Sequence, residues 1–203
     1  TATAAQLNTI NAATTLPVNA AAITGIITSS FADINTLYAA GTAGTITGLG
    51  NEAITPGVAV TVAQANSLAG FTTGLVTAAV SNGDIATLAG LISDTEADGT
   101  TAFPNALTIT VTDTTVSAAA LNALDAKTTV DVDATATTTL TGTLADVVAA
   151  YAADATGATV NLDGDEAVTI TDTGGINAAN LNTVNGRTSG VVTVSGITIL
   201  DGP

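Results

Sequence analysis

The stretch at 161–173, NLDGDEAVTITDT, places four acidic side chains around a glycine. Asp163, Asp165, Glu166 and Asp172 could support two kinds of chemistry. Carboxylates gathered on a turn are the ligands that Ca²⁺ takes in proteins. Two carboxylates held at a fixed separation can act as acid and base, or as acid and nucleophile, in glycoside hydrolysis. A third interpretation is that the stretch is a turn between two strands.

The spacing of these acids does not match known calcium loops. An EF-hand loop that began at Asp163 would have Ala167 at its fifth position and no glutamate at its twelfth. The stretch GNEAIT at 50–55 aligns with GDEAVT at 164–169. In this alignment Leu49, just before the stretch, corresponds to Asp163, and Asn51 corresponds to Asp165. We therefore expect no cofactor. If the chain binds calcium, Asp163 and Asp165 are the predicted metal ligands.

A hydrolase site built on Asp131 and Asp133, or on Asp163 and Asp165, is the enzymatic alternative. A sugar-binding site normally adds aromatic side chains, and this chain has only two Tyr and three Phe. The sequence has no His or Cys, so a Ser or Thr nucleophile has no imidazole to activate it. Lys127 is the one candidate lysine base. We predict no catalytic residues and no enzymatic activity.

The charge and composition exclude further classes of function. With two basic residues and a net charge of −15, the chain cannot neutralise a phosphate backbone, so nucleic acid is not an expected partner. No apolar run reaches 18 residues, so membrane insertion is not expected. Alanine makes up much of the 46% apolar content, which predicts a thin core.

Internal repeats dominate the sequence. Versions of one segment, LNTINAATT, ANSLAGFTT, LNALDAKTT and LNTVNGRTS, begin at positions 7, 65, 121 and 181, which lie 56 to 60 residues apart. A second motif alternates with the first and is clearest in FADINTLYAA at 31–40 and LADVVAAYAA at 144–153. A third motif, GNEAIT at 50–55, returns as GDEAVT at 164–169. The alternation indicates a basic repeat of roughly 29 residues, within the range of known solenoid repeats.

The elements that must carry the acidic turns follow from hydrophobic periodicity. In VSAAALNALDAK, Ser117 is a predicted N-cap before apolar residues at helical spacing. In LADVVAAYAA the face formed by Leu144, Val147, Val148 and Tyr151 is apolar. The segments 129–135, 158–162, 167–171 and 191–200 alternate apolar residues with Thr, Asp or Asn, which predicts half-buried strands. We interpret Tyr38 and Tyr151, which share one repeat position, as packing residues.

One asparagine recurs at the same position of each long repeat. Its side-chain amide could bond to backbone groups of its own repeat or of the next one. The four residues are Asn8, Asn66, Asn122 and Asn182.

Short repeats of this kind cannot bury their own apolar face, and neighbouring repeats supply the missing core. We therefore predict an α/β solenoid of about seven coils, each with roughly one helix and two short strands in parallel stacked sheets. The predicted single elongated domain has units at about 1–59, 60–114 and 115–173, with a partial unit at 174–203. A globular α/β domain with an internal duplication is the alternative.

The motifs VSAAALNALDAKTT, TTTLTGTLADVVAAYAA and GDEAVTITDT resemble the Ala/Thr-rich tandem repeats of giant cell-surface proteins of marine unicellular cyanobacteria, of the non-flagellar swimming and surface-coat type. The resemblance covers nearly the whole chain and is strongest at 115–189. It implies an extracellular structural protein of bacterial origin with no catalytic residues to carry over. The absence of Met leads us to expect a processed product or a piece of a longer chain.

These observations predict a segment or subunit of a surface fibre, filament, adhesin stalk or surface layer that self-assembles end to end. The predicted partner is another copy of the chain, head to tail, or adjacent repeats of a longer chain. A calcium-dependent adhesion module is the alternative function, and a polysaccharide-acting enzyme is a third.

Overall fold

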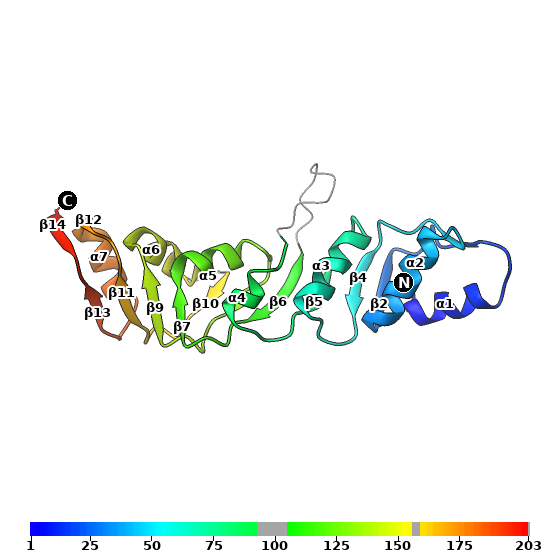
Figure 1. Ribbon diagram of the computed structural model, residues 1–203, viewed down its shortest axis with the longest axis horizontal. Helices are drawn as coiled ribbons and strands as arrows, with labels where there is room; N and C mark the ends of the chain where they lie inside the picture. Colours follow the sequence, from blue (N-terminus) through cyan, green and yellow to red (C-terminus); the bar gives the residue numbers. More distant parts are fainter. Residues whose placement is uncertain (93–104, 156–158, 203) are drawn as a thin grey trace. The chain divides into compact units, whose positions relative to one another are not determined.

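The computed structural model describes residues 1–92, 105–155 and 159–202, and in them seven helices alternate with parallel strands. This arrangement confirms the predicted α/β class. The chain divides into two compact units. The first comprises Thr1–Ser81 with Leu91–Thr108, and the second comprises Asn82–Gly90 with Ile109–Pro203. Figure 1 labels the elements along the chain.

The first unit contains three helices and short parallel strand pairs. Strand β1 pairs with β3, β2 with β4, and β5 with the first residues of β6. Helices α1 and α2 pack against each other. The elements are α1 (Ala4–Ala12), β1 (Val18–Asn19), β2 (Gly25–Ser29), α2 (Phe31–Thr42), β3 (Ile46–Thr47), β4 (Ala53–Pro56), α3 (Val62–Phe71), β5 (Thr77–Ala79) and β6 (Ala106–Thr110).

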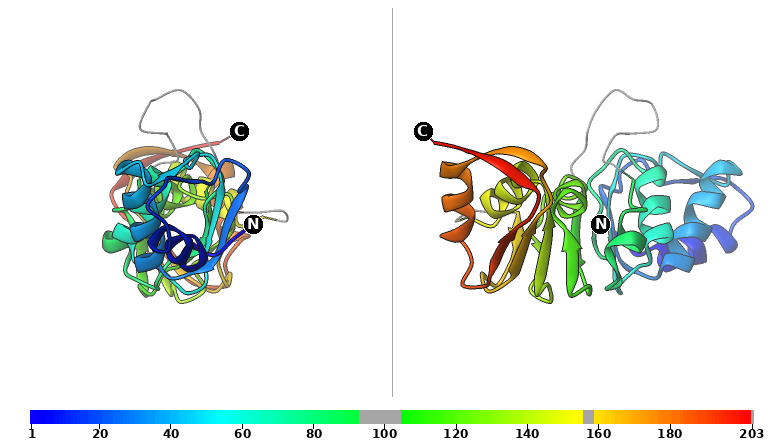
Figure 2. Two further views of the ribbon diagram at one scale, coloured as in Figure 1. Left: turned by 90° about the vertical axis from the view of Figure 1, so that its right-hand side faces the viewer. Right: turned by 60° about the vertical axis from the view of Figure 1, so that its left-hand side comes forward.

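The second unit has a longer parallel sheet, in the order β13-β11-β9-β7, and a helix layer in which α6 packs against both α5 and α7. Figure 2 shows these strands side by side with the helices next to them. The elements are α4 (Ile85–Leu88), β7 (Thr115–Ser117), α5 (Ala118–Asp125), β8 (Val132–Asp133), β9 (Thr139–Gly142), α6 (Leu144–Ala153), β10 (Val160–Asn161), β11 (Ala167–Ile170), β12 (Gly174–Asn177), α7 (Ala178–Asn185), β13 (Val192–Val194) and β14 (Ile197–Asp201).

The strands pair so that apolar residues of successive strands lie opposite each other. In the second unit, Leu140 lies between Val116 and Val168, and Val168 also lies opposite Val192. Successive partners are therefore 24, 28 and 24 residues apart. Because side chains alternate along a strand, this register turns the apolar residue of every strand to the same face.

Each unit has a narrow core of medium-sized aliphatic side chains. Ile26, Leu37 and Ile54 are fully buried in the first unit, and Leu121 and Leu140 in the second. Alanine fills the closest contacts, as at Ala4 and Ala118, which are both fully buried. Among the described residues, the aromatic side chains buried in these cores are Tyr38 and Tyr151.

Most of the helices begin directly after a polar residue whose side chain caps the first turn. Thr3, Ser30, Thr61, Asp84, Thr143 and Asn177 each accept a hydrogen bond from the backbone N–H three residues later. Ser117 is the N-cap residue of α5, as predicted, but its side chain makes no capping hydrogen bond.

Two sequence expectations differ in detail from the structure. On α6, Ala150 is buried whereas Val148 is only half-buried, so the buried face is rotated slightly from the predicted one. The predicted strand at 191–200 is two strands, because Gly196 adopts a φ of 86° and turns the chain between β13 and β14. A left-handed conformation of this kind is readily adopted by glycine.

Candidate functional site: acidic turns and contacts between neighbouring segments

The acidic stretch at 161–173 contains the turn between β10 and β11. Asp163 and Asp165 are exposed on this turn, on either side of Gly164, whose φ is 71°. Among residues 1–92, 105–155 and 159–202, no three or more acidic side chains form a group that could hold a metal ion. The turn therefore offers calcium two exposed carboxylates, whereas Ca²⁺ usually takes six to eight oxygen ligands.

Glu166, in the same turn, points inward and is fully buried. One carboxylate oxygen accepts a hydrogen bond from the Tyr151 hydroxyl at 2.9 Å, and the other accepts one from the Gly164 N–H at 2.9 Å. These donors replace the water that the carboxylate loses on burial, which would otherwise cost several kcal/mol. The sequence by itself did not predict this role for Glu166.

Glu52 repeats this arrangement in the first unit. It is fully buried, and its carboxylate accepts hydrogen bonds from the Tyr38 hydroxyl and from the Gly50 and Asn51 N–H groups. Tyr38 also stacks on Phe71, with ring centroids 4.8 Å apart. The two tyrosines therefore pack in the core, and each also donates a hydrogen bond to a buried glutamate.

Burial and the neighbouring carboxylate act together on each tyrosine. Removal from water raises the pKa of Tyr151, and the hydrogen bond to Glu166 and the charge of Glu166 raise it further. The same causes, with Glu52 as the partner, raise the pKa of Tyr38. Both hydroxyls are therefore held protonated, as hydrogen-bond donors, well beyond the usual range of a phenol.

We use the word segment for one helix with its adjoining strands. The backbone carbonyl of each buried glutamate accepts a hydrogen bond from the segment that follows it. The Thr188 hydroxyl donates to the carbonyl of Glu166 at 2.6 Å, and the Gly190 N–H donates to that hydroxyl at 2.9 Å. Thr72 and Gly74 make the same pair of bonds at Glu52. Each set links a turn of one segment to the loop after the next helix.

Two further acids connect neighbouring segments. An Asp172 carboxylate oxygen accepts a hydrogen bond from the Leu144 N–H, the first N–H of α6, at 2.6 Å. Asp113 does the same for Ile85 at the start of α4, also at 2.6 Å. A carboxylate at this position also interacts favourably with the positive end of the helix dipole. The shared sequence signal is TDT, at 112–114 and 171–173.

The recurring asparagines lie on the odd-numbered helices, and three of them reach the following segment. Asn8 donates to the carbonyl of Asp33, and Asn122 donates to that of Asp146, both at 3.0 Å. Asn66 accepts from the Ile92 N–H at 3.0 Å. Asn182 is exposed on α7, and its side chain has no hydrogen bond within the part of the chain that the structure describes.

The residues proposed for hydrolysis do not form an open site with aromatic walls. Asp131 is exposed before β8, and Asp133 accepts hydrogen bonds from the backbone and hydroxyl of Thr135. Tyr38 and Tyr151 are buried and bonded to glutamates, so neither forms a platform for a sugar.

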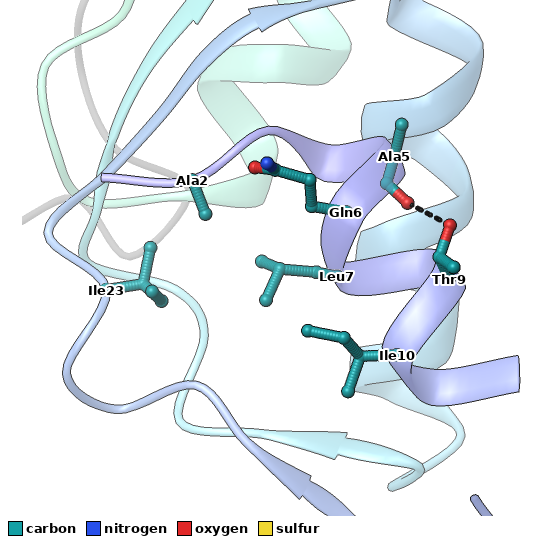
Figure 3. A pocket seen from close by; sticks show the side chains of 7 residues that line it. All are labelled: Ala2, Ala5, Gln6, Leu7, Thr9, Ile10 and Ile23. Carbon is teal, nitrogen blue, oxygen red and sulfur yellow. Dashed lines mark hydrogen bonds between the residues drawn. The ribbon is translucent and has the colours of Figure 1, made fainter. Parts of the chain in front are cut away.

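An open apolar groove of about 580 Å³ lies beside α1. Figure 3 shows the side chains of Ala2, Leu7, Ile10 and Ile23 pointing into it. In the second unit, the last strand exposes Ile199 and Leu200 by 58% and 56%.

The buried glutamates and the acids at the helix starts each carry a signal in the sequence. Glu52 and Glu166 are identical in GNEAIT and GDEAVT, whereas the flanking acids differ between the two copies. An acid that both copies keep was the better candidate for a structural role. Asp113 and Asp172 likewise stand in the shared TDT motif.

None of the described helices has the length and apolar character needed to cross a lipid bilayer. Searches against protein-family models, curated proteins and solved structures find no match to this chain.

Proposed function

We propose that this chain is a structural repeat protein, built as an α/β solenoid, that forms a segment or subunit of an extracellular fibre, adhesin stalk or surface layer. One observation carries the proposal: apolar residues of successive segments lie opposite each other in parallel strand pairs that share one register. Examples are Val116, Leu140, Val168 and Val192 in the second unit and Ile26 with Ile54 in the first.

The hydrogen bonds between segments support a structural role. Within each unit, side chains of one segment bond to the backbone of its neighbour, as Thr188 does at Glu166 and Asp172 does at Leu144. Most of the polar side chains described above are used in such contacts rather than directed into a cleft. In a solenoid these contacts join each repeat to its neighbours and create a continuous core.

The extracellular location rests on the resemblance to cell-surface repeats and on composition. The chain carries a net charge of −15, which keeps the outer surface of a fibre solvated and discourages lateral aggregation.

Small-angle X-ray scattering and negative-stain microscopy test the proposal. A solenoid gives a radius of gyration well above the ~16–17 Å of a compact domain of this length, and concentrated protein gives fibres in the microscope. A compact particle that stays monomeric at high concentration would refute the structural proposal.

A further inference from the structure

We propose that the first unit binds a neutral sugar in a cleft between helices α2 and α3 and the turn from β3 to β4. We name it the Phe71 cleft. Its walls include Asn35, Tyr38 and Thr42 of α2, Thr47 of β3 and Phe71 of α3. The inference goes beyond the proposed function, because a fibre or stalk segment needs no ligand, and it does not depend on assembly.

The cleft consists of two adjoining hollows whose walls share Tyr38, Thr42 and Phe71. Their volumes are about 450 and 250 Å³, and the larger hollow alone falls within the ~300–1,000 Å³ that small-molecule sites occupy. The rings of Tyr38 and Phe71 stack at an interplanar angle of 10°. Tyr38 is buried and its hydroxyl is bonded to Glu52, whereas Phe71 is half-buried. Phe71 is therefore the ring with a surface left for a ligand.

The second copy of the motif fills the corresponding space. Four residues before the buried glutamate, Gly48 of the first copy corresponds to Leu162, which is 6% exposed. Three residues after the tyrosine, Gly41 corresponds to Asp154, whose carboxylate accepts a hydrogen bond from the Leu162 N–H at 2.8 Å. In the first copy the side chain of Leu49 lies beside Gly41 and takes part of this space. The remainder is the larger hollow.

The helix layer is also more open at this point. Helix α6 packs against α7, whereas α2 and α3, which carry the same two motifs, do not pack closely along their length. The ring stack of Tyr38 on Phe71 bridges them. In the second copy, Arg187 holds the position of Phe71 and is exposed. The aromatic wall is thus a property of the first copy.

Two polar side chains line the cleft in the first copy and have no polar counterpart in the second. Asn35 is exposed on α2, and its amide makes no hydrogen bond to any described residue. The Thr42 hydroxyl donates to the Tyr38 carbonyl at 3.1 Å, so its oxygen remains able to accept a bond. Val148 and Ala155 occupy these positions in the second copy. The copy with the cleft therefore also has hydrogen-bonding groups for a polar ligand.

The chemistry of the walls favours a neutral ligand with hydroxyl groups and one apolar face. None of the described residues along the cleft carries a charge. An anion would find no cation there, and the net charge of −15 would repel it. The nearby carboxylate of Glu52 is already bonded to Tyr38 and to N–H groups of its own turn, so it offers a cation little. A pyranose has C–H groups on one face for Phe71 and hydroxyls at its rim for Asn35 and Thr42.

Amide chemical shifts measured by NMR test the inference residue by residue. The probes are the methyl glycosides of glucose, galactose, mannose and N-acetylglucosamine, each added to the intact chain at millimolar concentration. We expect one or more of them to shift the amides of Thr42, Gly48 and Phe71 until the site is saturated. The amides of Leu162 and Gly164 in the second copy are the internal control and should not move.

Variants that take their residues from the second copy locate the site. Phe71→Arg removes the aromatic wall and should weaken binding by about tenfold. Asn35→Val removes a hydrogen-bonding group from an exposed position and should also weaken binding, so it keeps the test available if Phe71→Arg does not fold. Arg187→Ala is the matched control at the position of Phe71 and should bind like the wild type. Circular dichroism and melting temperature establish that each variant is folded.

Other outcomes overturn the inference in distinguishable ways. If no glycoside shifts the cleft amides, or if indole shifts them and no glycoside does, the cleft is not a sugar site, and the proposed structural function stands. If folded Phe71→Arg and Asn35→Val bind like the wild type, the sugar binds elsewhere. Glucuronate and glucosamine should bind more weakly than the neutral glycosides, and tighter binding of either would contradict a neutral ligand.

Discussion

A carboxylate that leaves water needs hydrogen-bond donors nearby, and Glu52 and Glu166 find theirs within their own turns and on the preceding helix. Gly50 and Gly164 supply N–H groups, and Tyr38 and Tyr151 supply hydroxyls. Because both members of each pair are buried, removal of one leaves the other with an unmet requirement. Substitution within either pair should therefore give the largest loss in the free energy of unfolding per atom removed.

Tyr151→Phe should lower the free energy of unfolding by about 1–3 kcal/mol, because the Glu166 carboxylate stays buried with one donor fewer. Urea unfolding followed by circular dichroism measures the change. Asp163→Asn, in the same turn but exposed, should stay within about 0.5 kcal/mol of the wild type. Equal losses in both variants would contradict the role assigned to the pair.

The raised pKa of each tyrosine also predicts a pH dependence. A hydroxyl that stays protonated in the folded protein stabilises it fully below the ordinary tyrosine pKa of 10.0, and this contribution is lost as the pH rises above that value. The free energy of unfolding should therefore stay level up to about pH 9 and fall as the pH rises past about 10. Replacing Tyr38 and Tyr151 together by Phe should flatten this slope, and an unchanged slope would assign it to other groups.

Gly190 lies at a close contact between two segments. A Cβ at this position would lie 2.3 Å from the carbonyl oxygen of Glu166, well inside van der Waals contact. Gly190→Ala should therefore force the two segments apart and lower the melting temperature by several degrees or more. Gly70→Ala is the control, since a Cβ there meets nothing within 4 Å and alanine favours the helix. The control should be neutral or stabilising.

At the scale of elements, the first turns of α4 and α6 each receive two side-chain contacts, one from the same segment and one from the next. Thr143 caps α6 from within its own segment, and Asp172 binds the first N–H of the same helix from the next segment. Helix α4 has the same double support from Asp84 and Asp113. The second contact makes the stability of one helix depend on the presence of the following segment, which couples neighbours in the manner of repeat proteins.

Asp172→Ala should cost about 0.5–2 kcal/mol, the usual range for loss of a helix cap. The local signature is faster hydrogen exchange at the Leu144 amide, which native-state exchange measured by NMR resolves. Asp131→Ala removes an exposed acid with the same change of charge. If both variants leave the Leu144 exchange rate unchanged, the contact contributes nothing to the helix start.

At the scale of the whole molecule, calcium dependence is the property that separates the proposed structural role from the adhesion-module alternative. The described residues contain no group of three or more acids that could hold an ion, and the two predicted ligands, Asp163 and Asp165, are exposed on one turn.

We therefore expect the same melting temperature in chelator and in millimolar calcium, when magnesium at equal concentration serves as the control for ionic strength. A rise specific to calcium would revive the adhesion-module alternative. Loss of that rise in Asp163→Asn/Asp165→Asn would then place the ion at this turn.

The sequence alone determined the α/β class, the alternation of two helix motifs and the possibility of a turn at Gly164. These features depend on local periodicity, on glycine and on short polar residues before helices, all of which act within a few residues. The predicted boundaries were broader than the strands observed, as at 129–135, where only Val132–Asp133 pairs.

Only the tertiary structure decided which acids matter. Asp163, Asp165 and Glu166 are neighbours in the sequence, yet only the last is buried, where its carboxylate accepts hydrogen bonds from the Tyr151 hydroxyl and the Gly164 N–H. The partner of Asp172 lies 28 residues earlier, at Leu144, and such a contact depends on the register between strands. A local sequence pattern does not encode that register. From the sequence alone, the acidic stretch therefore resembled a metal-binding loop.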